Sequence, residues 1–234
     1  MSEQHCCPVV ELRQYTLVPG QRDVLVDLFE REFIESQEAI GMTIIGQFRD
    51  LNNPDRFVWL RGFSDMESRA RQLQEFYGGP VWKKHRDAAN ATMIDSDNVL
   101  LLRPSHSGSD FSLGNLKRPE LGGSETSRGL IAATIYYLRD SADSFAQFFE
   151  TAVVPKLANA GAAMLATFVT ETHPNTFPAL PVREGENVFI SCARFLNRES
   201  YDQHEKEFAA VRSALLKKAP EVLLLTPTNR SLLR

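Results

Sequence analysis

The sequence predicts an α+β protein in which two β-α-β-β-α-β repeats close into one barrel. Three observations predict this fold. The apolar hexamer VLLLRP at 99–104 returns as VLLLTP at 222–227, apolar helical stripes recur 120 residues apart, and a segment rich in Ser and Gly separates the two copies. This element order is the ferredoxin-like pattern, an antiparallel sheet with both of its helices on one face.

The first repeat is expected to span residues 9–104. Pro19 suits the first turn of its first helix, and Gly41 suits the end of that helix. Between them the apolar residues recur at helical spacing. The elements that the pattern marks, in chain order, are 9–17, 19–40, a strand around Phe48, 56–65 and 99–104.

The second repeat is expected to span residues 129–234 and to keep this layout. Its opening strand at 131–139 follows that of the first repeat at an offset of 121. Residues 105–128 are expected to form the linker, and residues 1–8 a flexible N-terminal tail. The helical residues with apolar counterparts 120 positions later are Leu25 with Phe145, Leu28 with Phe148, Phe29 with Phe149 and Phe33 with Val153.

Both faces of each sheet are expected to be buried. Ile44 is followed by Ile45, and Phe57 by Val58, so strand neighbours that point to opposite faces are all apolar. A sheet with two apolar faces needs a packed layer on each of them. We expect the sister repeat to provide the second layer, so that the barrel closes within one chain. Only the outer surfaces then remain for any homodimer.

The composition argues against several classes of protein. A net charge of −4 without a cluster of Lys and Arg argues against nucleic-acid binding. No apolar run approaches the roughly 18 residues of a membrane helix, and MSEQHCCPVV lacks a signal-peptide pattern, so we expect a cytoplasmic protein. Cys6, Cys7 and Cys192 are expected to be reduced thiols. Standard metal, phosphate-loop and nucleophile motifs are absent from the sequence, and no metal is expected.

The first candidate site is a set of polar residues on two strands. Alternation places Glu11, Arg13 and Tyr15 on one face of a strand, while Trp59 and Arg61 share a face of its expected neighbour. A structural Glu–Arg pair, inside the barrel or at its rim, and the wall of a ligand pocket both fit this pattern. The second copy lacks the charges, as a pocket confined to the first copy would allow. The residues that replace Glu11, Arg13, Trp59 and Arg61 are Ala132, Thr134, Ser191 and Ala193.

The second candidate site is a helical segment that the second copy lacks. It places Trp82 and Arg86 on one side, flanked by His85 and Asn90. A polar pair beside a tryptophan suits a pocket wall. The alternative makes His85 a boundary residue and lets Arg86 lay its stem along the core with its head in water. The long hairpin at 171–186 either covers a pocket or is a mobile surface loop.

Four stretches of the first repeat carry a family resemblance: ELRQYTLVPGQ at 11–21, GQFRD at 46–50, VWLRGFSDMESR at 58–69 and PVWKKHRDAANATMIDSDNVLLLRP at 80–104. They resemble the NIPSNAP domain of the dimeric α/β-barrel superfamily. The second repeat looks like a diverged copy without the Pro-Gly pair and both tryptophans. The resemblance implies the fold. Superfamily relatives include cofactor-free monooxygenases, lactone isomerases and haem enzymes, so analogy of fold assigns no activity.

Three functions are compatible with these residues, and the sequence leaves open whether any reaction is catalysed. The leading expectation is a small apolar or aromatic ligand, bound without a cofactor in a pocket of the first repeat. The second is a cofactor-independent monooxygenase or isomerase acting on a small aromatic or polyketide-like substrate, with Tyr15, His85 and Asn90 as catalytic residues. The third is a haem protein with His85 or His204 as axial ligand. The expected ligand-binding residues are Glu11, Arg13, Trp59, Arg61, Trp82 and Arg86.

Overall fold

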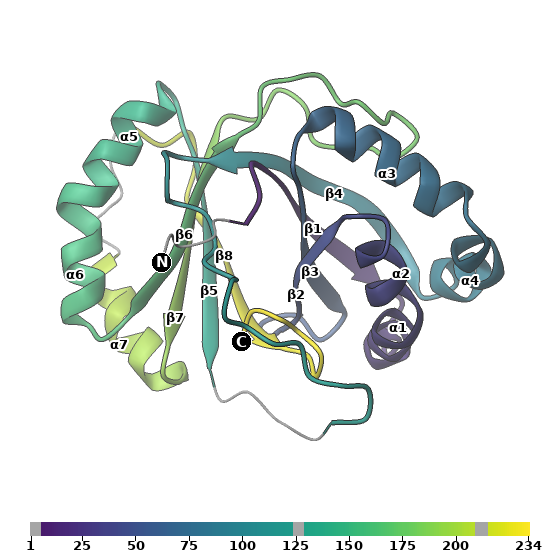
Figure 1. Ribbon diagram of the computed structural model, residues 1–234. Coiled ribbons are helices and arrows are strands. Elements are labelled where there is room, and N and C mark those ends of the chain that lie inside the picture. Colours follow the sequence, from purple (N-terminus) through teal and green to yellow (C-terminus); the bar gives the residue numbers. More distant parts are fainter. Residues whose placement is uncertain (1–5, 124–128, 209–214) are drawn as a thin grey trace.

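The computed structural model describes residues 6–123, 129–208 and 215–234 (Figure 1). Over these residues, eight antiparallel strands form a closed barrel in the order β1-β3-β2-β8-β5-β7-β6-β4. The strands are β1 (Val9–Leu17), β2 (Thr43–Asp50), β3 (Arg56–Phe63), β4 (Met93–Pro104), β5 (Leu130–Tyr137), β6 (Ala163–Thr170), β7 (Val188–Phe195) and β8 (Glu221–Pro227). The helices are α1 (Arg22–Leu28), α2 (Ile34–Glu38), α3 (Met66–Gly78), α4 (Pro80–Asn90), α5 (Ala142–Phe148), α6 (Val154–Asn159) and α7 (Arg198–Phe208), with π-helical turns η1 (Phe29–Phe33) and η2 (Phe149–Val153).

Each repeat supplies half of the barrel, which confirms the expected fold. Within the closed order, one half reads β4-β1-β3-β2 and the other β8-β5-β7-β6, the ferredoxin-like arrangement twice. The halves join where edge strands of different repeats pair. Asp50 of β2 lies opposite Leu225 of β8, and Leu102 of β4 lies opposite Thr170 of β6. Closure removes the exposed strand edges that each half would otherwise present.

The repeated VLLL strands are apolar on both faces because both faces are covered. In β8, Leu223 and Leu225 point into the barrel interior, whereas Leu224 packs under the helices of the second repeat. In β4, Leu100 points inward and Leu101 points towards the helices of the first repeat. Because successive residues of a strand point to opposite faces, each residue of the apolar run packs against one of the two covering layers.

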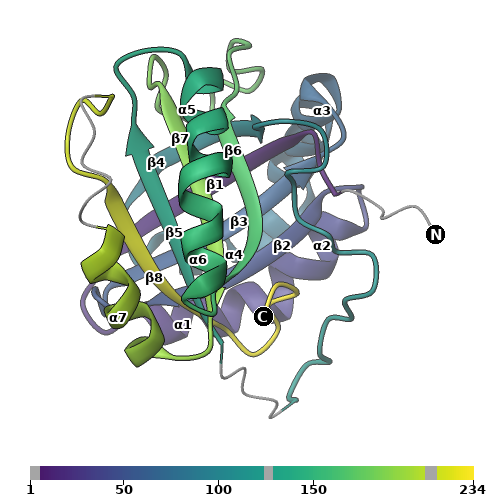
Figure 2. The same ribbon diagram turned by 90° about the vertical axis from the view of Figure 1, so that its left-hand side faces the viewer.

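The helices cover the outside of the barrel in two groups, α1 to α4 over the first half and α5 to α7 over the second (Figures 1 and 2). The π-helical turns occupy Phe29–Phe33 and Phe149–Val153, again 120 positions apart. Strand irregularities match as well, between Ile44 and Gly46 in β2 and between Met164 and Ala166 in β6. The duplication thus extends to local backbone detail. None of the described helices combines the length and the apolar character that a bilayer crossing requires.

Segments outside the two repeats fill space in the barrel. Cys7, Phe111 and Leu233 are buried in the interior core, so the described parts of the expected tail and linker are packed against the barrel. Residues 1–5 and 124–128 of those segments lie outside the described ranges. Arg118 ties this stretch to both repeats, because it donates 2.5 Å hydrogen bonds to the carbonyl oxygens of Ile44 in the first and Arg230 in the second.

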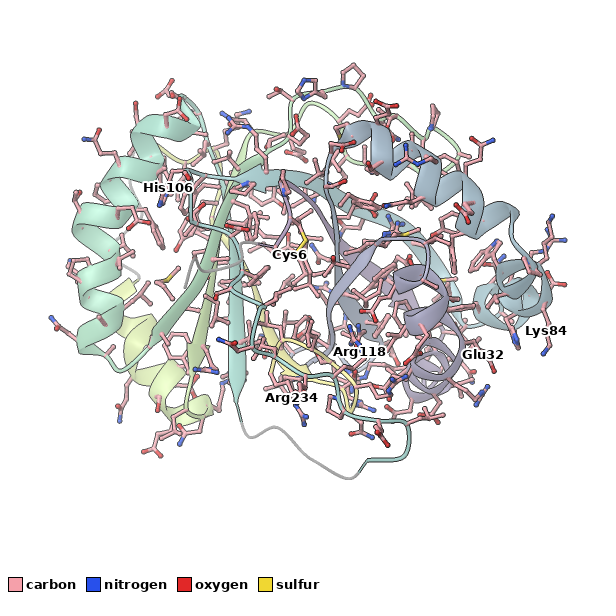
Figure 3. All side chains as sticks on the ribbon, viewed as in Figure 1. Cys6, Glu32, Lys84, His106, Arg118 and Arg234 are labelled. Atoms are coloured by element: carbon pink, nitrogen blue, oxygen red, sulfur yellow. A yellow bond between two sulfur atoms is a disulfide. The ribbon has the colours of Figure 1, made fainter. Side chains whose placement is uncertain are left out.

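The expectation of reduced thiols is wrong for Cys6 and Cys7, which a disulfide joins. The pair is held against the core rather than on a free tail, and Figure 3 shows Cys6 between the two halves of the barrel. Gly62 makes this approach feasible, because a Cβ atom there would lie 2.2 Å from Cys7 Sγ. Cys192 is a free, buried thiol, as expected for a small core residue.

Candidate functional site

The polar residues of β1 and β3 meet on the outer face of the first repeat's sheet, beneath its helices. Glu11 lies opposite Arg61, and Arg13 lies opposite Trp59. The side chains of Glu11, Arg13 and Arg61 are 0% exposed. This group lies neither inside the barrel nor at its rim, because the inner face of β1 carries Val10 and other apolar residues.

Glu11 is the shared partner of three guanidinium groups. Its Oε2 accepts hydrogen bonds from Arg61 Nη2 at 2.6 Å and from Arg13 Nη1 at 2.9 Å. Its Oε1 accepts one from Arg69 Nε at 2.8 Å. We call Glu11, Arg13, Arg61 and Arg69 the buried arginine cluster. Charge-assisted bonds of this kind are strong, and here they hold β1, β3 and α3 together.

Arg69 and Gln37 belong to the hydrogen-bond network around Glu11, but they were not identified in the sequence analysis. Each of them interrupts an apolar stripe of a helix. Arg69 lies on α3 in helical register with Leu73 and Phe76, so it interrupts an apolar stripe. Gln37 interrupts the stripe of Phe29 and Phe33 in the same way. Its Oε1 accepts a hydrogen bond from Arg61 Nη1 at 2.8 Å, and its Nε2 donates to the Phe33 carbonyl at 2.8 Å.

The second repeat completes the network from its long hairpin. Arg69 Nη1 donates to Asn175 Oδ1 at 2.9 Å. The Phe177 ring stacks on Tyr77, with 6.0 Å between ring centroids and 19° between ring planes. The hairpin at 171–186 runs across the top of Figure 1 towards α3. It covers the first repeat, as one of the two interpretations of the sequence expected.

The electrostatics of the cluster are dominated by positive charge. Burial would raise the pKa of Glu11, but Arg61, Arg13 and Arg69 together hold the pKa of that carboxyl well below its usual range. Burial raises the pKa of the Tyr15 phenol, which is therefore neutral at physiological pH. One carboxylate against three guanidiniums leaves a net charge of +2 in the cluster.

A small cavity of about 30 Å³ adjoins the cluster, between the sheet and the helices. Tyr15 and Trp59 form part of its wall, with Gln37 beside them. Aromatic side chains from η1, α3 and α4 form most of the remainder, and Tyr77 and Trp82 meet edge to face at 4.9 Å. The cavity is mostly apolar, with a few polar groups on the side of the cluster.

Three of the other expected site residues do not line this cavity. His85 is partly buried, its ring lies 6.4 Å from that of Phe33, and its Nε2 lies 3.4 Å from Oε2 of Glu32. Arg86 and Asn90 are exposed, because α4 buries Ala89 against the sheet and turns these side chains outward. The placement of the His204 side chain lies outside the described residues. Of the expected α4 residues, Trp82 lines the cavity.

The second repeat has a packed core where the first has its cluster. Ala132 and Ala193 replace Glu11 and Arg61, and both are buried beneath the helices. Phe149 and Phe189 pack with ring centroids 4.8 Å apart, as their counterparts Phe29 and Phe57 do at 5.5 Å in the first repeat. The polar site is therefore a property of the first repeat alone.

The fold and the buried site define a dimeric α/β-barrel protein whose two halves come from one polypeptide. Two candidate monooxygenases share this fold over the whole chain. The protein from Lactobacillus acidophilus NCFM has 16% identity and a TM-score of 0.56, and covers 95% of this chain and 94% of its own. The protein from Fusobacterium nucleatum subsp. nucleatum ATCC 25586 has 8% identity and a TM-score of 0.58, and covers 96% and 94%.

The family is shown by the first repeat. Residues 10–107 match the family model of NIPSNAP. An uncharacterised NIPSNAP-like domain protein from Burkholderia xenovorans is 30% identical, with coverage of 43% of this chain and 87% of that one and a TM-score of 0.40. The chain belongs to the NIPSNAP family, whose function is unknown. The comparison with curated proteins gave no match.

Proposed function

We propose that this protein binds a small apolar or aromatic molecule in the cavity of the first repeat. The observation that carries the proposal is the composition of the cavity wall, in which aromatic rings surround a few polar groups from Tyr15, Gln37 and Trp59. Ligand pockets are typically apolar with a small number of polar groups that orient the ligand. The cavity volume of about 30 Å³ has room for a water molecule, so binding of an aromatic ring requires α4 or the covering hairpin to shift.

Intrinsic fluorescence tests this proposal directly. The chain has two tryptophans, and both Trp59 and Trp82 line the cavity. Titration with phenol or toluene is expected to give a saturable change in tryptophan emission. Ala89→Leu should abolish that change, because Ala89 is buried in the cavity wall. Ala88→Leu is the matched control, since Ala88 is exposed on the same helix. Equal responses of the two variants would contradict the proposal.

A cofactor-independent oxygenase or isomerase is the second candidate function. It is favoured by the Tyr15 hydroxyl, which accepts a 3.0 Å hydrogen bond from Arg13 Nε beside the cavity. A hydroxyl held this way can orient a substrate or exchange a proton with it. Oxygen uptake with hydroquinone or anthrone substrates, without added cofactor, tests this candidate. Tyr15→Phe is expected to lower the rate by about 100-fold or more. His85 and Asn90 are not among the residues that line the cavity, so this candidate function depends on Tyr15.

We also propose a cytoplasmic location and, for any homodimer, contact through the outer helical surfaces. The free thiol of Cys192 supports the location, whereas the Cys6–Cys7 disulfide is of a kind that is rare in the cytosol. Closure of the barrel within one chain supports the mode of contact. Cell fractionation and light scattering test these two points.

A further inference from the structure

The buried arginine cluster has more positive charge than its own residues balance. Glu11 is the one carboxylate that contacts Arg13, Arg61 and Arg69 among the residues described, and all four side chains are 0% exposed. The ionisable groups that act on this set across β1, β3 and α3 include Tyr15, whose phenol pKa is raised by burial, so that it adds no negative charge at physiological pH. Burying a net charge of +2 is unfavourable unless a further negative group contributes.

Hydrogen-bond donors beside the cavity are also unmatched. Gln47, Trp59 and Arg13 lie opposite one another on β2, β3 and β1, so they form one row that faces the helices. Their exposures are 0%, 2% and 0%. Within the described part of the chain, Trp59 Nε1 and Arg13 Nη2 have no hydrogen-bond partner, and neither do Nε2 and Oε1 of Gln47. Buried polar groups are nearly always paired. Trp59 Nε1 and Arg13 Nη2 can only donate, so these two neighbours indicate a site for an acceptor.

The row and the cavity share a wall. Trp59 and Tyr15 both line the cavity, and the Arg13 guanidinium lies 5.5 Å from the centre of each ring. Arg61 lies 4.9 Å from the Trp59 ring. Contact with these ring faces stabilises a guanidinium, but it neither cancels the charge nor supplies an acceptor for an N–H group. A ligand in the cavity would therefore meet the positive charge at this wall.

A half-barrel of this kind can form without such a cluster. The second repeat builds the same half-barrel with Ala132, Thr134, Ser191 and Ala193 at the corresponding positions. A purely structural network would be expected in both copies. In the described parts of the chain, the cluster occurs only in the repeat that has the cavity. We therefore relate its positive charge to the ligand of that cavity.

We infer that the ligand of the first repeat is an aromatic oxyanion, a carboxylate or a phenolate, whose oxygen atoms face Arg13 and Trp59 while its ring lies among the aromatic side chains. This inference rests on the proposed binding function and adds the chemical class of the ligand. A planar oxyanion matches the fork of a guanidinium and brings the negative charge that the cluster requires.

Matched probes test the inference in the wild-type protein. Benzoate is compared with benzamide, and 4-cyanophenol is compared above and below its own pKa, by tryptophan fluorescence and calorimetry at constant ionic strength. At least one anion is expected to bind about tenfold or more tightly than its neutral counterpart, because hydrogen bonds to charged groups are the stronger ones. The two pairs distinguish a carboxylate from a phenolate ligand. Equal affinities within both pairs would overturn the inference and leave the proposed binding function intact.

Substitutions test whether the preference for the anion arises at Arg13 and Trp59. Arg13→Met is expected to abolish the preference for the anion, whereas Arg86→Met on the exposed face of α4 should leave it unchanged. If Arg13→Met does not fold, Trp59→Phe removes one unmatched N–H while keeping an aromatic ring, and it should reduce the preference several-fold. A preference that survives both Arg13→Met and Trp59→Phe would overturn the assignment to this wall. The absence of a saturable signal with every probe would overturn the proposed function together with the inference.

Discussion

Glu11 is the residue on which the electrostatic balance of the buried cluster depends. Replacing it with glutamine leaves Arg13, Arg61 and Arg69 buried without a counter-charge. We expect Glu11→Gln to lower the free energy of unfolding by about 3–5 kcal/mol, as measured by urea denaturation. Glu32→Gln is the control, since Glu32 forms a partly exposed pair with Arg31 and should cost little. Similar losses in the two variants would contradict this account of the cluster.

The pKa of Glu11 also determines how the free energy of unfolding depends on pH. The pKa of Glu11 is lower in the folded protein than in the unfolded chain. Its contribution is therefore complete above the unfolded pKa of about 4.3 and is lost as the pH falls towards the folded value. The difference in unfolding free energy between wild type and Glu11→Gln should be constant above about pH 5.5 and shrink below about pH 4. Denaturation series at several pH values measure it, and a difference that grows in acid would have the wrong sign.

Cys192 offers a measure of core integrity. Burial raises the pKa of its thiol to about 12, and no charged group compensates within the residues described. Because the thiolate is the reactive form, the native protein should show almost no reaction with a disulfide reagent at about pH 8. Unfolding without reduction should release one thiol per chain, and reduction with unfolding should release all three. Rapid reaction of the native protein would show that the barrel interior opens easily.

How much of the site the sequence predicts depends on how local the contacts are. Strand alternation was sufficient to bring Glu11 to Arg61, because β1 and β3 are neighbours in any ferredoxin-like sheet. Arg69 and Gln37 could have been identified from the sequence as polar residues within apolar helical stripes. Asn175 could not, since its contact with Arg69 spans 106 residues and exists only when both halves are joined.

At the scale of elements, the hairpin at 171–186 connects the second repeat to the site of the first. Asn175 organises it, because Oδ1 accepts from Arg69 Nη1 and from the Phe177 backbone N–H at 3.0 Å, and Nδ2 donates to the Leu180 carbonyl at 3.0 Å. The length of the hairpin was visible in the sequence. Its direction was not, because closure of the barrel determines which helices the hairpin covers.

Asn175→Ala is expected to loosen this cover. The substitution removes three hydrogen bonds and leaves Arg69 Nη1 with the longer 3.3 Å bond to Thr176 Oγ1, which should cost about 1–3 kcal/mol of local stability. Hydrogen exchange should accelerate in 171–186 and at the N-terminal part of α3, while the barrel strands remain protected. Glu184→Ala, on the exposed part of the same hairpin, is the control. Unchanged exchange in the Asn175 variant would show that the hairpin is held by Phe177 and its apolar neighbours instead.

At the scale of the whole molecule, the barrel could be predicted because the strands carry apolar residues on both faces and the pattern occurs twice. Ile44 and Ile45, for example, pack on opposite sides of the sheet, Ile44 under the helices and Ile45 in the barrel. What the periodicity did not reveal is how the interior is completed. Phe111 and Leu233 come from segments without a regular apolar pattern, so their burial depends on the assembled barrel.

Closure within one chain makes a prediction about each half. A fragment of residues 1–104 would expose its inner face, including Leu12, Phe48 and Leu100, and would leave the edges of β2 and β4 unpaired. A sheet with an exposed apolar face and open edges associates with another copy. We therefore expect the fragment to dimerise or aggregate, whereas the full-length chain at the same concentration needs no partner to cover this face. Light scattering and circular dichroism of both proteins provide the test. A folded, monomeric fragment would show that the first repeat stabilises its sheet without the second, and mutual burial of the two sheets would then no longer explain the duplication.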